Sequence, residues 1–163
     1  MPTIPDNAVF QQRLAALPVA TYQAGETVFA AGSRTGRLLI LRKGAVVIVK
    51  ENVEIAKVAE PGAVFGELSV LLDQPHTAHV RALETSQFLV ADAATLLAQD
   101  PIAALYVATA LARRLDGANQ VLIQLKSQLE AGQSRSMVAK TVEKMEGLLA
   151  AGDSSLVHTD RDW

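Results

Sequence analysis

Short β-rich runs follow one another between Val19 and Asp92, and this pattern constrains the fold more than any other feature of the chain. The runs are residues 27–29, 37–42, 45–50, 53–59, 79–82 and 87–91. Turn-forming residues separate them, at Gly25, Gly32, Gly36, Gly44, Asn52 and Pro61-Gly62. Several short strands at this spacing are typical of a sandwich or a barrel. We therefore expect an α+β fold built on an eight-stranded jelly-roll β-barrel.

Helices are expected on both sides of the β-rich region. Before it, Asp6 or Asn7 can cap a short helix that ends at Pro18. After it, residues 93–98 form a short helix, and Pro101 takes the tolerated first position of a long one. Beyond Gly132, residues 136–150 have an apolar face and predict one more helix, and residues 152–163 form a polar tail.

The segment from Pro61 to Ala82 has the composition of an anion-binding turn. It contains the run Phe65-Gly66-Glu67-Leu68-Ser69, a short apolar helical step, and then Pro75-His76-Thr77-Ala78 before a strand. Backbone N–H groups at a helix start can point at a phosphate, while a neighbouring carboxylate accepts a sugar hydroxyl. A glutamate in that position also has a purely structural interpretation, because it interacts favourably with the helix dipole.

This segment resembles the phosphate-binding cassette of the cyclic nucleotide-binding domain, with its pattern Phe-Gly-Glu-Leu-Ala followed by Pro-Arg-Thr-Ala. The glycines of the β-rich region also lie where that family has structural glycines, so the resemblance covers residues 6–131. The run Ala112-Arg113-Arg114-Leu115 is similar to the dimer helix of catabolite activator/Fnr-type regulators. We divide the chain into a cyclic nucleotide-binding-like domain with its long helix (residues 1–131) and a helical extension with a flexible tail (residues 132–163).

The resemblance implies roles for individual residues. Glu67 would accept a hydrogen bond from the ribose 2′-hydroxyl, Gly66 allows close backbone approach, and Thr77 offers a hydroxyl to the phosphate. Ile48 and Ala56 match positions that wall the base. The predicted ligand-binding residues are Phe65, Gly66, Glu67, Leu68, Ser69, His76, Thr77, Ala78, Ile48 and Asn119.

The resemblance assigns less definite roles to three positions on the long helix. In activator-type relatives, two polar residues after the arginines touch the base, one from each subunit. Here these positions are Ala118 and Asn119, so at best half of that contact remains. Arg114 is a candidate pocket residue, but we favour a solvated helical face as its environment.

His76 is the departure from the cassette pattern, because the family has its phosphate-pairing arginine there. Arginine carries a permanent charge, and its planar guanidinium binds phosphate with two hydrogen bonds. Histidine has an ordinary pKa of about 6.5, so it is mostly neutral at pH 7. Losing a charge-assisted contact costs about 1.5–3 kcal/mol, or roughly 10- to 150-fold in affinity. The alternative is that His76 is a tolerated residue in a pocket that has lost its ligand. His79 replaces a threonine or serine that favours guanine in some relatives, so cAMP is a better candidate than cGMP.

Leucines recur with heptad spacing along the long helix. Leu111, Leu115, Ala118, Leu122, Leu125 and Leu129 follow one another at alternating intervals of four and three. A narrow apolar stripe of this length indicates a partner helix, most simply from a second copy in a homodimer. The alternative is that the helix docks on its own barrel.

Composition excludes several classes of function. A net charge of −2 gives no electrostatic case for nucleic acid or a membrane surface as a partner, and without cysteine there is no thiolate chemistry. The N-terminus lacks the features of a signal peptide, and no apolar run is long enough to span a membrane, so we expect a soluble cytoplasmic protein. His76 and His79 point to opposite faces of a strand, which argues against a metal site. No catalytic constellation or DNA-reading helix is recognisable, so we expect neither an enzyme nor a DNA-binding half.

Two hypotheses follow. The first is a dimeric, cAMP-preferring regulatory sensor that signals through its C-terminal helix to a protein partner. The second is a constitutive dimerisation or docking module that has lost nucleotide binding because of His76.

Overall fold

The computed structural model describes residues 7–132 and 135–151. The predicted cap Asp6 and the predicted tail, residues 152–163, lie outside these ranges. Eight strands in the described part form two antiparallel sheets, with the strand orders β1-β8-β3-β6 and β2-β7-β4-β5. The strands are β1 (Val19–Tyr22), β2 (Thr27–Phe29), β3 (Arg37–Lys43), β4 (Val46–Lys50), β5 (Val53–Val58), β6 (Val64–Phe65), β7 (His79–Ala82) and β8 (Ser86–Asp92). The mixed helix-and-sheet class is therefore confirmed, with eight strands.

Strand β3 separates two hydrophobic cores because its successive side chains point to opposite faces of the sheet. Leu39 and Leu41 point into the barrel, where they join the fully buried Phe88. Leu38 and Ile40 point outward and pack against the helices. Four consecutive buried residues in β3 thus reflect a sheet that is covered on both faces.

Five helices surround the sheets in the described ranges: α1 (Asn7–Ala15), α2 (Glu67–Leu71), α3 (Ala93–Gln99), α4 (Pro101–Glu130) and α5 (Arg135–Ala151). The caps follow from the sequence. The Asp92 side chain accepts a hydrogen bond from the backbone N–H of Thr95 at the start of α3. Asp100 accepts from Ile102 and Ala103 at the start of α4, where Pro101 is the first residue.

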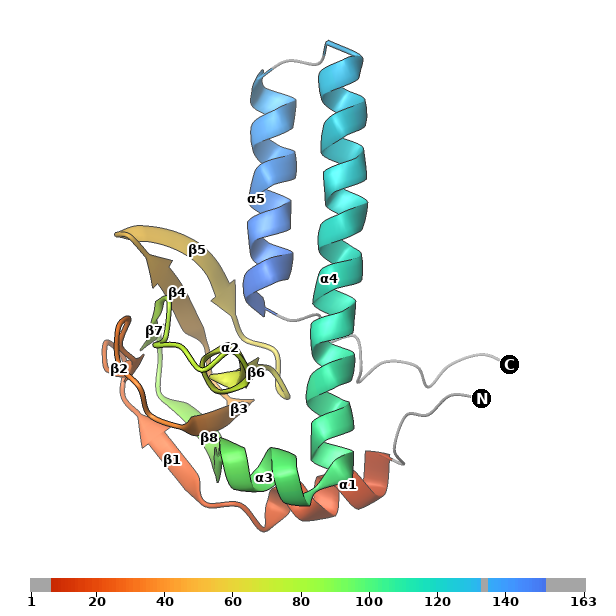
Figure 1. Ribbon diagram of the computed structural model, residues 1–163. Coiled ribbons are helices and arrows are strands. Elements are labelled where there is room, and N and C mark those ends of the chain that lie inside the picture. Colours follow the sequence, from red (N-terminus) through yellow and green to blue (C-terminus); the bar gives the residue numbers. More distant parts are fainter. Residues whose placement is uncertain (1–6, 133–134, 152–163) are drawn as a thin grey trace.

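The long helix α4 extends well beyond the barrel, and α5 runs back beside it (Figure 1). The two helices are joined by a hydrogen bond of 2.7 Å from the Thr141 hydroxyl to the Gln128 side chain. The buried Val121 lies on α4 along this stretch. At its lower end α5 also contacts β5 (Figure 1). The helix predicted for residues 136–150 therefore forms, and it packs on α4 and the barrel.

A membrane span requires a helix that is both long and strongly apolar, and no single helix in the described ranges meets both requirements. The pair α3 and α4 does so by length and composition only, and it is bent by 107°.

Candidate functional site

A cavity of about 350 Å³ lies between β4, β5, the segment 64–80 and α4. Nine of the ten predicted site residues line it: Ile48, Phe65, Gly66, Glu67, Leu68, Ser69, His76, Thr77 and Ala78. The lining also includes Phe29, Lys50, Ile55, Val64, Gln74, Pro75, Val80 and Arg114. Asn119, the tenth predicted residue, is exposed on α4 and is not part of this lining.

Gly66 forms the tight backbone turn between β6 and α2 at the wall of the cavity. It caps α2 in the left-handed conformation, with φ of +93°. A Cβ atom at this position would lie 2.3 Å from the Arg37 carbonyl oxygen and 3.2 Å from the Phe29 ring, so only glycine fits. The tight turn places the next side chain, Glu67, inside the protein, where only 4% of its surface is exposed.

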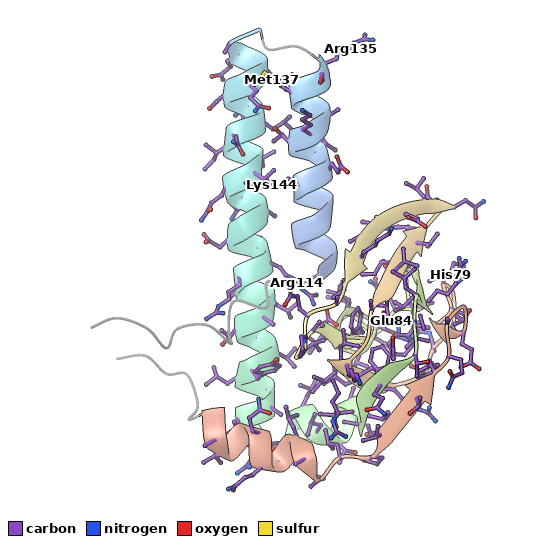
Figure 2. All side chains as sticks on the ribbon, turned by 180° about the vertical axis from the view of Figure 1, so that it is seen from behind. His79, Glu84, Arg114, Arg135, Met137 and Lys144 are labelled. Atoms are coloured by element: carbon purple, nitrogen blue, oxygen red, sulfur yellow. The ribbon has the colours of Figure 1, made fainter. Side chains whose placement is uncertain are left out.

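Glu67 forms a buried ion pair with Arg114 of α4. One guanidinium nitrogen, Nη1, donates to the Glu67 carboxylate, and Nη2 donates to the Val64 carbonyl oxygen at 3.0 Å. Arg114 is 8% exposed and lies on the side of α4 that faces the barrel (Figure 2). Its Nε is buried and has no hydrogen-bond partner in the described part of the chain. The interpretation of Arg114 as a solvated helical residue was wrong.

The sequence does contain a signal for this arginine. The buried residues of α4 are Ala103, Val107, Ala110, Arg114 and Val121, which follow one another at intervals of four, three, four and seven. Arg114 thus lies on the same face of α4 as the buried apolar residues, the face that packs against the rest of the domain. A carboxylate placed inside a barrel also needs a cationic partner, because an unpaired buried charge is very costly. Together, these two arguments identify the partner of Glu67.

His76 is buried against the loop that precedes β3. Its ring stacks on Phe29 with centroids 4.2 Å apart, and its Nε2 lies 2.9 Å from the Thr35 hydroxyl oxygen. Backbone bonds fix the same contact: the Gly32 N–H donates to the His76 carbonyl and the His76 N–H donates to that of Ser33. Burial lowers the pKa of His76, and the Glu67 carboxylate offsets this only in part. The imidazole is therefore neutral at pH 7 and supplies no fixed charge.

Of the two residues predicted to wall the base, Ile48 lines the cavity, but Ile55 lines it in place of Ala56. Strand β5 has a bulge opposite β4, because Ile48 pairs with Ala56 while the next residue, Val49, pairs with Glu54. The extra residue, Ile55, lines the cavity, and Ala56 is not in the lining. A strict period of two cannot anticipate such a bulge.

Two other polar residues of the segment, Ser69 and His79, have structural partners. The Ser69 hydroxyl donates to the Gln74 carbonyl at 2.5 Å, closing the turn after α2. His79 is exposed, accepts a hydrogen bond from the Ala31 N–H, and lies on the side of the barrel away from α4 (Figure 2). No group of three His, Asp or Glu residues in the described ranges could hold a metal ion.

A second contact joins α4 to the same region. The Tyr106 hydroxyl donates to the Gly62 carbonyl at 2.7 Å, and Gly62 precedes β6. Burial raises the pKa of Tyr106. Tyr106 and Arg114 therefore attach the long helix to the strand and turn that form one wall of the cavity.

Comparison with known proteins identifies the family. Residues 19–99 match the cyclic nucleotide-binding domain, so the chain contains a domain of this regulatory family. A comparison with curated proteins gives no match. Among solved structures, the chain is similar to the N-terminal domain of a transcriptional regulator from Streptomyces coelicolor A3(2), with 29% identity, a TM-score of 0.54, and coverage of 71% of this chain and 88% of that one.

Two further structures share the fold. The catabolite activator protein of Thermus thermophilus has 21% identity and a TM-score of 0.59, with coverage of 90% of this chain and 81% of that one. The cAMP-bound PfPKA-R (141–441) has 24% identity and a TM-score of 0.50, over 75% of this chain. The chain spans only 39% of the length of PfPKA-R in that structure.

Proposed function

We propose that this protein is a dimeric, cAMP-preferring regulatory sensor that signals through α4 to a protein partner. The observation that carries the proposal is the open cavity of about 350 Å³, whose wall contains the whole cassette and the buried pair of Glu67 and Arg114. Cavities of about 300–1,000 Å³ are typical of small-molecule sites. If the barrel had lost its ligand and served only as a scaffold, the cavity would more simply be filled by side chains of the protein itself.

The preference for cAMP is supported by the surroundings of His79. Its imidazole is engaged with the Ala31 N–H and takes no part in the cavity wall. The position that favours guanine in some relatives therefore offers no group to a bound base. One of the similar structures, PfPKA-R, is described as cAMP-bound.

Signalling through α4 is supported by its contacts with the cavity wall. Arg114 binds the cassette carboxylate directly and also the Val64 carbonyl, and Tyr106 binds the Gly62 carbonyl. A ribose hydroxyl that donates to Glu67 binds the same carboxylate as Arg114 and so can alter the ion pair. A ligand that changes this pair changes the position of α4, provided that it binds the two positions with different free energies.

The second candidate function is a constitutive dimerisation or docking module. It is favoured by His76, which is neutral, stacked on Phe29 and directed at Thr35. In that case the barrel serves only to present α4 and α5.

Calorimetric titration with cAMP and cGMP distinguishes the two functions. We expect the protein to bind cAMP more tightly than cGMP, and His76→Arg to strengthen cAMP binding about 10-fold or more because it restores a charge-assisted contact. Circular dichroism confirms that each variant is folded. If neither the wild-type protein nor His76→Arg binds either nucleotide, the docking module is the correct function.

A further inference from the structure

The charges in the cavity wall do not cancel. Its ionisable residues are Lys50, Glu67, His76 and Arg114. Glu67 and Arg114 neutralise each other in direct contact, and burial keeps His76 neutral. Lys50 makes no ion pair with any residue in the described ranges. The wall therefore carries a single unbalanced positive charge, and it is that of Lys50.

The register of the sheet places Lys50 at one end of the cassette. Strand β4 pairs antiparallel with β7, with Ile48 opposite Val80 and Val49 opposite His79. The next step along this register sets Lys50 beside Ala78. Alternation puts Lys50 on the same face as Ile48, and both side chains line the cavity, as do Val80 and Ala78.

The nearest acidic residue on the neighbouring strand does not neutralise Lys50. Glu54 of β5 pairs with Val49, whose side chain alternates with those of Ile48 and Lys50, and Glu54 is not part of the cavity wall. Lys50 lines the cavity and is also exposed, so this residue lies at the mouth of the cavity. It is available to an anion that enters beside Thr77 and Ala78.

We propose that Lys50 supplies the fixed positive charge for the anionic group of the ligand, in place of the arginine that the cassette lacks at position 76. This inference rests on the proposed function and assigns the ligand class: an anion with one negative charge, such as the phosphodiester of a cyclic mononucleotide. A flexible lysine acts as a point charge and not as a bidentate fork, so it compensates only part of the lost contact.

The test compares two lysines of the same sheet. In titrations with cAMP, Lys50→Ala should raise Kd about three- to fivefold, the range of a partly solvated ion pair. Lys57→Ala is the matched control, because Lys57 is exposed on β5 and is not part of the cavity wall. It should change Kd by less than about twofold. Added salt should weaken cAMP binding to the wild-type protein more than to Lys50→Ala.

A double variant separates a direct charge effect from a structural one. In the His76→Arg background the new guanidinium takes over the anion, so Lys50→Ala should lose less affinity there than in the wild-type background. If wild type binds cAMP and Lys50→Ala binds it equally well, the assignment of Lys50 is wrong and the proposed function stands. If neither wild type nor His76→Arg binds a cyclic nucleotide, both proposals are wrong.

Discussion

His76 stands at the position where the cassette pattern has an arginine, and its surroundings give it a structural role. The backbone of Gly32 and Ser33 forms hydrogen bonds with the His76 backbone. The His76 ring stacks on Phe29 and lies within hydrogen-bond distance of the Thr35 hydroxyl. Histidine is small and flat enough to be stacked in this way. The substitution of arginine by histidine therefore removes a fixed charge and adds a packed, titratable ring to the cavity wall.

The protonation of His76 should affect ligand affinity and protein stability in opposite directions. Its pKa in the free folded protein is below the ordinary value, so the unfolded chain binds more protons and stability falls as the pH drops through about 6.5. A bound anion favours the protonated ring, so cAMP affinity should rise over the same range. We expect titrations at pH 6 and pH 8 to give the tighter binding at pH 6, and thermal melts of the free protein to give the lower Tm there.

Two variants show whether His76 causes this behaviour. His76→Gln removes the titratable group, so both the affinity and the Tm should lose most of their dependence on pH in this range. His79→Gln changes an exposed histidine outside the cavity wall and should leave the pH dependence of the affinity intact. An affinity that does not vary between pH 6 and pH 8 in the wild-type protein would remove His76 from the ligand contact.

At the scale of elements, α4 is joined to the barrel by polar contacts at one end of the cavity. Arg114→Leu leaves the Glu67 carboxylate buried without a partner, and we expect a loss of about 3–5 kcal/mol in the free energy of unfolding. Denaturant titration measures this value. Arg42→Leu, on the exposed end of β3, is the control and should stay within about 0.5 kcal/mol of the wild-type protein.

The double variant Glu67→Gln/Arg114→Leu distinguishes a charge effect from a packing effect. With both charges removed, much of the stability lost in Arg114→Leu should return, because no uncompensated charge remains in the interior. If the double variant is as unstable as Arg114→Leu alone, the guanidinium acts mainly through its packing and its bond to the Val64 carbonyl.

The elements were predictable where a local pattern decides the structure. Six of the strands follow from short runs rich in apolar residues between turn signals, and the starts of α3 and α4 follow from Asp92 and from Asp100-Pro101. Strands β1 and β6 were not predicted, because β6 has only two residues and β1 owes its place to pairing with β8. The Ile55 bulge and the stacking of His76 on Phe29 depend on pairings between distant segments, which no local pattern encodes.

At the scale of the whole molecule, α4 leaves an apolar stripe uncovered. Leu115, Leu122 and Leu129 are 62%, 48% and 60% exposed, at intervals of seven residues, and the neighbouring Ile123 is 66% exposed. The other predicted seam positions, Leu111, Ala118 and Leu125, are partly buried within the chain itself. Packing of α5 on α4 therefore leaves half of the heptad seam free, and this free half is the surface that supports the proposed homodimer.

A charge in the middle of this stripe tests the dimer. Leu122→Glu should raise the dissociation constant of the dimer at least about a hundredfold, because it would bury an unpaired carboxylate between two helices. Sedimentation velocity over a range of concentrations measures the change. Gln124→Glu adds the same charge two residues, or about 200°, further round α4, where the side chain is exposed, and should leave the dimer intact. A wild-type protein that is monomeric at every concentration would contradict the dimer.

The position of Arg114 along α4 has a mechanical consequence. About 24 Å of helix lies between this arginine and Glu130, at 1.5 Å per residue. A tilt of about 5° centred on the ion pair then carries the far end of α4 through roughly 2 Å, and α5 travels with it because the two are bonded near that end. If α4 signals to a partner as proposed, a tilt this small at the ion pair is enlarged, by leverage alone, into a shift of the far end of the helix pair.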